Sequence, residues 1–153
     1  MNKTGFSLMN KLSPQKIKIL RVVYDLEAQG LPIIGPKEIS ERLQISKSYA
    51  FIAMKALTKQ GYLLHFPRKG FRLSEKGKKV AKRLIRNHRI LEIIFVKYIG
   101  FDKETACCFA RILESRVPSH IVEEIANKLG NPTICPCGYR IPAREECEEG
   151  IIP

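Results

Sequence analysis

The sequence predicts a mainly α-helical protein: an N-terminal winged helix-turn-helix domain over residues 1–75, then an all-α domain over residues 76–153. Three observations lead to this prediction. Two short amphipathic segments are separated by a tight break near residue 44, and a β-hairpin pattern follows them. A long helical pattern then starts basic and becomes almost wholly apolar, which indicates a helix that bridges a cationic domain and a hydrophobic one.

Capping residues delimit three predicted helices in the first part of the chain. Ser is a favoured N-cap, Pro suits the first helical position, and Gly ends helices because it adopts the left-handed conformation readily. Hydrophobic residues at helical spacing support each segment. The predicted helices cover residues 14–29, 36–43 and 47–60, and their boundary residues are Ser13, Pro14, Gly30, Pro36, Ser46 and Gly61.

The third predicted helix has one inward and one outward face. The inward stripe consists of Ala50, Ala53, Met54 and Leu57. Recognition helices contact bases from their N-terminal ends, so the outward residues there are candidates for DNA contacts. The alternative for Phe51 and Ile52 is that they pack on a neighbouring helix. The predicted DNA-binding residues of this segment are Ser46, Lys47, Ser48, Tyr49, Phe51, Ile52 and Lys55.

Residues 62–73, YLLHFPRKGFRL, predict two short strands joined by a Pro-Arg-Lys-Gly turn. Beside a helix-turn-helix, such a hairpin is typical of a wing. Arg68, Lys69 and Arg72 at its tip are expected to contact phosphates, which positions a protein on DNA without reading the sequence. The alternative is an ordinary solvated turn.

Three further helices are predicted in the second domain. Ser74 is expected to cap one long helix that reaches about Tyr98, and Asp102 and Ser119 to cap the two that follow. Residues 131–153 then form a loop and tail that contain Pro, Cys and Glu. Because two or three apolar helices cannot bury all their surface within so small a domain, we expect a homodimer.

The charge of the chain is unevenly distributed. The net charge is +12, but residues 1–100 hold 21 Lys and Arg against 6 Asp and Glu, whereas residues 101–153 hold 6 against 9. Clustered cations favour a polyanion, most simply double-stranded DNA, because binding releases condensed counterions. A membrane surface is the alternative. No apolar run reaches the roughly 20 residues of a membrane span.

Localisation and enzymatic activity can also be judged from the sequence. The N-terminus MNKTGFSLMNKL is too short and polar for a signal peptide, which indicates a cytoplasmic protein. Five cysteines is an odd number, which argues against a disulfide framework. We find no Gly-rich phosphate loop and no nucleophile–base pair at a recognisable spacing, so we do not expect an enzyme.

Two stretches carry a resemblance to a known family. IGPKEISERLQISKSYAFIAMKALTKQGYLLHFPRKGFRLSEKGKKVAKRLIRNHRILE and the late loop CPCGYRIP resemble the diphtheria-toxin-repressor family of metal-dependent transcription regulators, which includes manganese-transport repressors. The resemblance covers about residues 13–142. It implies a dimer in which metal binding between the two domains favours operator binding, and it suggests that the SH3-like domain of some members is missing.

Carried onto this chain, the main metal site of that family has lost its ligands. Lys18 and Arg21 stand where the family has an Asp or Met and often a Glu, and Arg111 and Ser115 replace a Cys or Glu and a His. Ammonium and guanidinium groups have no lone pair to offer a metal. Only Glu114 remains, and it is expected to pair with Lys18 or Arg111.

The second metal site implied by the resemblance is better preserved. His88 and Glu92 match its His and Glu, four residues apart on one helix face. Cys107 stands where a second His is expected, and Cys108 is adjacent. Thiolate in place of imidazole makes a site softer, which favours zinc, iron(II) or an iron–sulfur cluster over manganese.

The Cys135-Pro136-Cys137 turn can aim two thiolates at one centre. A helix thiol and Cys147 would complete three or four ligands, which suit an iron–sulfur cluster or a mononuclear zinc or iron site. The third alternative is packing or thiol redox chemistry without a metal. The full set of predicted metal ligands is His88, Glu92, Cys107, Cys108, Cys135, Cys137 and Cys147.

The sequence therefore predicts a sequence-specific transcription regulator, a repressor, that responds to an iron–sulfur cluster or a soft metal bound by cysteines. One alternative is a winged-helix DNA-binding protein that has a structural zinc site or no metal and is regulated otherwise. Another is an architectural or RNA-binding protein. His65 and His120 have no identifiable partners and are predicted to be structural or exposed.

Overall fold

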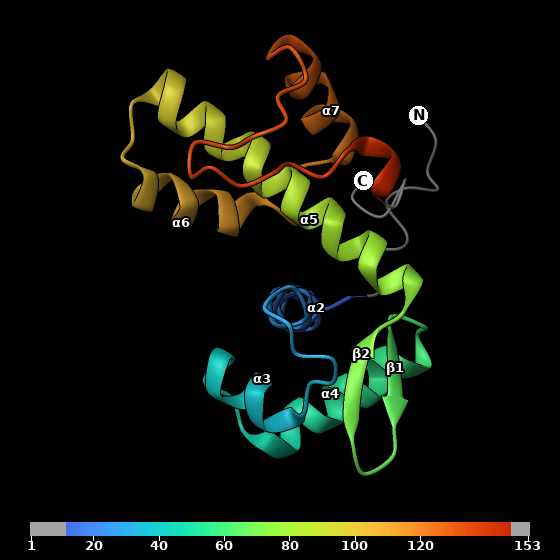
Figure 1. The fold of residues 1–153 in the computed structure, drawn as a ribbon. Coiled ribbons are helices and arrows are strands. Elements are labelled where there is room, and N and C mark those ends of the chain that lie inside the picture. The colour runs from blue at the N-terminus through green and yellow to red at the C-terminus, as the bar shows by residue number, and fades with distance from the viewer. Residues whose placement is uncertain (1–11, 148–153) are drawn as a thin grey trace. The chain divides into compact units, whose positions relative to one another are not determined.

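A computed structural model describes residues 12–147 of the 153-residue chain, and Figure 1 shows its helices and its one hairpin. The described residues form two compact units, Leu12–Ala81 and the residues from Lys82 onward. The division falls inside the long helix α5 (Glu75–Ile94). The architecture is the predicted one, with a winged helix-turn-helix followed by an all-α domain.

The first unit begins with the three predicted helices, α2 (Pro14–Ala28), α3 (Pro36–Leu43) and α4 (Lys47–Lys59). The Ser13 hydroxyl accepts a hydrogen bond from the amide of Lys16 at 3.3 Å, and that of Ser46 accepts one from Tyr49 at 3.1 Å. Both predicted N-caps are thus confirmed. Gln44 ends α3 in the left-handed conformation (φ 54°), which produces the tight turn between the two helices of the motif.

The predicted wing is an antiparallel hairpin of β1 (Leu63–Phe66) and β2 (Gly70–Leu73). Ile34 pairs with β2 through an isolated antiparallel bridge, because its amide and carbonyl each form a 2.8 Å hydrogen bond with Phe71. Gly70 (φ 138°) permits this close approach, since a Cβ there would lie 2.7 Å from the Ile34 carbonyl oxygen.

The N-terminus of α5 packs against the residues that lead into the wing. Ser74 caps it as predicted, because its hydroxyl accepts a hydrogen bond from the Gly77 amide at 3.0 Å and donates one to the Gly61 carbonyl at 2.5 Å. A Cβ on Gly77 would lie 2.0 Å from the Tyr62 carbonyl oxygen, so only glycine fits at this crossing. The apolar core of this unit includes Ile19, Leu20, Val23, Ile34, Ile39, Met54, Leu57, Leu63, Phe71 and Leu73.

The second unit contains three helical segments as expected, with two differences in detail. The long helix is α-helical to Ile94 and then continues as a π-helix, Phe95–Ile99. Asp102 caps α6 (Lys103–Leu113), accepting a hydrogen bond from the Thr105 amide at 2.9 Å. The prediction that Ser119 caps the last helix is wrong: α7 (Ser119–Lys128) has Pro118 at its N-cap, because a proline ring already fixes the extended backbone needed there.

After α7 the chain returns along α5, as Figure 1 shows. This segment includes one bridge, Ile134↔Arg140, and a 3-10 turn, Arg144–Glu146. The apolar core of this unit is Ile90, Ile93, Val122, Ala126, Cys135 and Ile141. No helix among residues 12–147 is long and apolar enough to cross a membrane.

A buried ion-pair network holds α7 against α5. Arg83 and Arg86 converge on the Glu123 carboxylate at 2.5 and 2.8 Å, and Arg86 also donates a hydrogen bond to the Pro142 carbonyl at 3.0 Å. Burial alone would raise the pKa of Glu123, but the hydrogen bonds from Arg86 and Arg83 outweigh it and lower the pKa to about 2. The carboxylate is therefore ionised at neutral pH.

Candidate nucleic-acid interface and metal centre

The two faces of α4 lie as the sequence predicts. The inward stripe of Ala50, Ala53, Met54 and Leu57 is buried, with no member more than 5% exposed. On the other face Ile52 is 66% exposed, Tyr49 is 47% exposed, and Lys55 is half-buried. An exposed run of large side chains at the N-terminal half of such a helix is able to meet base edges and thymine methyl groups. Ser46, Lys47 and Ser48 are exposed at its beginning.

Phe51 has aromatic neighbours in the wing. Its ring lies edge-on to the rings of His65 and Phe71, at centroid distances of 6.3 and 6.1 Å. His65 in turn stacks on Phe71 at 4.5 Å and places its Nδ1 3.4 Å from the Lys55 ammonium. Sequence reasoning found no partner for His65, since strand pairing is what brings it to α4.

The wing tip presents the three predicted cations, Arg68, Lys69 and Arg72, all exposed. The amide of Lys69 donates a 3.0 Å hydrogen bond to the Phe66 carbonyl, which closes the turn. Arg68 occupies the left-handed region, with φ 64°. A long cationic residue where glycine would be unstrained is a conformational cost of about 1 kcal/mol.

In the second unit, His88 on α5 lies between a carboxylate and a thiol. Its Nδ1 is 2.9 Å from Glu114 Oε2, and its Nε2 is 3.5 Å from Cys107 Sγ on α6. His88 and Glu114 are both buried. The expectation that Glu114 pairs with Lys18 or Arg111 is not met by these contacts, because the imidazole one helix away is its hydrogen-bond partner.

One turn along α5, Glu92 contacts the other predicted thiol. Cys137 donates a hydrogen bond to Glu92 Oε1 at 2.6 Å. This hydrogen bond, with some desolvation, raises the pKa of Cys137 to about 11. Burial likewise raises the pKa of Cys107, and nearby Arg111 only partly offsets the effect. Both thiols are therefore expected to carry their protons at neutral pH when no metal ion is bound to them.

The remaining cysteines lie in different surroundings. Cys135 is buried in the apolar core of the second unit, and Cys108 is exposed on α6. Cys147 is buried, and its thiol donates a hydrogen bond to the Ala143 carbonyl at 3.3 Å. The pKa of Cys147 is raised by burial, with Arg83 and Arg86 opposing the shift, which places this thiol beside the ion-pair network.

Among residues 12–147 the structure holds two ligand pairs, not a formed metal cage. No group of three or more His, Cys, Asp or Glu side chains in this part of the chain is arranged to hold a metal ion. His88 with Cys107, and Glu92 with Cys137, nevertheless supply an imidazole, a carboxylate and two thiols, which suit zinc or iron(II). The structure does not bring four thiols together, so an iron–sulfur cluster has no support from it.

Of the residues that the resemblance puts at the family's main site, the three basic ones offer no metal ligand. Lys18 on α2 is exposed, and Arg21 is buried with its Nε 3.7 Å from Asp25 Oδ2. Arg111 on α6 is exposed, and Ser115 follows Glu114. The side chains that can act as metal ligands therefore lie around His88 and Glu92.

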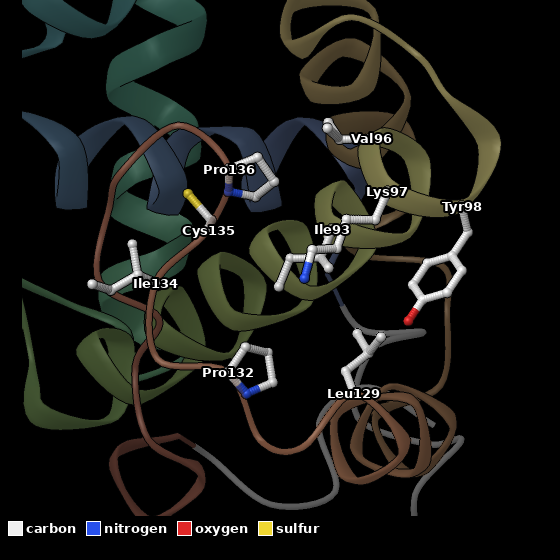
Figure 2. Close-up of a pocket in the computed structure, with 9 residues that line it drawn as sticks. All are labelled: Ile93, Val96, Lys97, Tyr98, Leu129, Pro132, Ile134, Cys135 and Pro136. Atoms are coloured by element: carbon white, nitrogen blue, oxygen red, sulfur yellow. The ribbon is translucent and has the colours of Figure 1, made fainter.

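A hollow of about 280 Å³ lies at the end of α5 (Figure 2). Its lining is mostly aliphatic and proline carbon, with Lys97, Tyr98 and the Cys135 thiol as the other groups. It includes none of His88, Glu92 or Cys137, so it is separate from the thiol pairs.

Comparisons with known proteins extend over both units. Residues 11–71 match the family model of the iron-dependent repressor N-terminal DNA-binding domain, and residues 74–143 match that of the iron-dependent repressor metal-binding and dimerisation domain. The chain is 30% identical over 145 residues to the iron-dependent repressor IdeR of Mycobacterium tuberculosis, which covers 95% of this chain and 63% of that protein. The chain thus spans less than two thirds of this relative.

Solved structures give the same result. A crystal structure of ScaR with bound Zn²⁺ is similar with a TM-score of 0.77 and 32% identity, over 88% of this chain and 62% of that one. The hypothetical protein SSo2273 from Sulfolobus solfataricus is similar with a TM-score of 0.73 and 29% identity, over 86% of this chain and 100% of that one.

Proposed function

The chain belongs to the iron-dependent repressor family, and from this premise we propose that it is a DNA-binding transcription repressor that responds to a soft divalent metal ion. We propose that it acts in the cytoplasm as a homodimer on a double-stranded operator, and that it is not an enzyme. IdeR of Mycobacterium tuberculosis and the diphtheria toxin repressor of Corynebacterium jeikeium are repressors by name, which supports this proposal.

The observation that carries the proposal is the exposed N-terminal half of α4 beside a basic wing. Tyr49 and Ile52 offer apolar and polar contacts to base edges, and Arg68 offers charge to phosphates. The proposed DNA-binding residues are Ser46, Lys47, Ser48, Tyr49, Phe51, Ile52, Lys55, Arg68, Lys69 and Arg72.

The proposed metal ligands are His88, Glu92, Cys107 and Cys137. Zinc or iron(II) suits this donor set, and the bound cation would stabilise both thiolates. In this proposal Glu114 orients the imidazole by accepting a hydrogen bond from Nδ1–H. The lone pair on Nε2 then points toward Cys107. The Cys137 thiol donates its proton in a hydrogen bond to Glu92, so coordination of a metal ion by the Cys137 thiolate would require this proton to leave.

DNA binding can be tested by selecting duplexes from a random pool with the metal-loaded protein. The best duplex is then compared with a scrambled one by fluorescence anisotropy at about 200 mM salt. Tyr49→Ala should reduce the ratio between the two affinities by roughly 10-fold, the value of one good base contact. Tyr98→Ala, which removes another exposed tyrosine, in the second unit, is the control. Equal binding of both duplexes by the wild type would refute a specific repressor.

The metal site can be tested by anaerobic titration with Zn²⁺ or Fe²⁺, followed by dialysis and elemental analysis. His88→Ala and Cys137→Ser should lower the bound metal, whereas Cys108→Ser, which changes the neighbouring exposed thiol, should not. Proton release on zinc addition at pH 7.5 should fall in Cys137→Ser. Unchanged metal content in both ligand variants would exclude this set of ligands.

A further inference from the structure

His65 connects the wing to the helix that faces the proposed DNA. It sits on β1 directly opposite Phe71, and their rings stack at 4.5 Å with 26° between the planes. Phe51 from α4 closes the group by presenting its edge to both rings. Phe71 is 1% exposed and Phe51 43%, so the cluster begins in the core and ends at the outward face of α4.

The contact between His65 and Lys55 requires the imidazole to act as the hydrogen-bond acceptor. An ammonium group only donates, so the Nδ1 of His65, 3.4 Å from Lys55 Nζ, must present its lone pair. A ring that accepts this hydrogen bond at Nδ1 carries a proton on Nε2. Of the three side chains in these contacts with His65, Lys55 is charged and the two phenylalanines are not.

This arrangement limits the freedom of two side chains on the outward face of α4. Lys55 would otherwise move among many rotamers and lose that freedom on binding a phosphate or base. Immobilising one such side chain before binding is worth roughly 2- to 10-fold in affinity. The side chain of Phe51 is also restrained, in its case by the edge-on contact of its ring with His65.

We propose that His65 is a positioning residue for DNA binding, because its imidazole holds Lys55 and Phe51 in the orientation in which α4 meets the duplex. The role rests on the proposed function, since it requires α4 to contact DNA. His65 itself acts through these two side chains, and the wing strand supplies the rigid support.

Four variants, built from three substitutions, separate the hydrogen bond from the ring stack. His65→Phe keeps an aromatic ring on Phe71 and removes the acceptor, whereas His65→Asn keeps an acceptor near the position of Nδ1. With the duplex chosen by selection, His65→Phe should weaken binding roughly 2- to 10-fold, and His65→Asn should restore at least part of that loss. Lys55→Ala combined with His65→Phe should weaken binding no more than Lys55→Ala alone, because both changes remove one interaction.

The imidazole state is measured independently in the free protein. The ¹⁵N chemical shifts of His65 at pH 7.5 should report a neutral ring protonated on Nε2, and thermal unfolding should show that the variants remain folded. Either a proton on Nδ1 or additive effects of the two substitutions would overturn the inference while leaving the proposed function intact. If the wild type bound no duplex at all, the proposed function would fail, and this role with it.

Discussion

Glu123 is the residue whose replacement should most clearly change the stability of the second unit. It receives Arg83 at 2.5 Å and Arg86 at 2.8 Å, and all three side chains are buried. Glu123→Gln keeps the size and one acceptor oxygen but removes the charge. Two buried guanidinium groups would then face a neutral amide, which is the costly half of breaking a buried ion pair.

The size of the effect follows from the pKa of this carboxyl group. Its folded-state pKa of about 2 lies below the ordinary 4.5, and the difference corresponds to about 3 kcal/mol of unfolding free energy at neutral pH. Because the folded-state pKa is depressed, this stability is fully present above pH 4.5 and is lost as the pH falls toward 2. Loss of one partner of a buried pair costs about 3–5 kcal/mol in general, which agrees with this value.

The assay is urea unfolding followed by far-UV circular dichroism, with a chelator present so that metal does not add to stability. At pH 7 the unfolding free energy of Glu123→Gln should be about 3 kcal/mol below that of wild type. Glu124→Gln, one residue along α7 and exposed, should stay within about 0.5 kcal/mol. Between pH 5 and 2.5, the gap between wild type and Glu123→Gln should shrink. A gap that is absent at pH 7, or constant with pH, would refute the reasoning.

Three further substitutions test the first unit. Arg68→Gly should raise the unfolding free energy by up to about 1 kcal/mol, because glycine adopts the positive φ without strain. It should weaken binding to the selected and the scrambled duplex equally; a change in the ratio of the two affinities would mean that Arg68 reads bases. Gly77→Ala should lower the unfolding free energy, measured by thermal unfolding, by about 1–3 kcal/mol or more, because the added Cβ would meet the Tyr62 carbonyl. Gly30→Ala is the control, since a Cβ there has open space and costs only the strain of the positive φ. Equal losses of unfolding free energy in the two variants would contradict the clash. Phe71→Ala should cost about 3–5 kcal/mol in urea unfolding, and a loss below about 1 kcal/mol would show that the wing core is not essential.

Most of the fold could be predicted because the signals are local. Ser13, Ser46 and Asp102 cap helices with their own side chains, and the Pro67–Gly70 turn closes a hairpin between two apolar segments. The cap of α7 was misplaced by one residue, since Pro118 and Ser119 both suit a helix start. The π-helix at the end of α5 has no local signal, because periodicity does not distinguish it from the preceding α-helix.

The site was only partly predictable because its contacts are distant in sequence. His88 and Glu92 share a helix face, so their proximity follows from spacing alone. The pairing of His88 with Glu114, and of Cys137 with Glu92, depends on how α6 and the late loop lie on α5. Spacing likewise could not show that Cys135 enters the apolar core, since a buried cysteine and a ligand have the same sequence signature.

The contacts of Arg86 with Glu123 and with the Pro142 carbonyl also constrain the order in which the second unit folds. Arg86 must close 37 residues of chain to reach Glu123 and 56 to reach the Pro142 carbonyl, and the shorter closure has the smaller entropic barrier. We therefore expect α7 to dock on α5 before the returning segment does. The thiol of Cys137 would then reach Glu92 late in folding, after the helices on which it depends are in place. In a nascent chain, Cys137 and Glu92 would in that case stay apart until late in folding, and their contact would be among the last tertiary contacts to form.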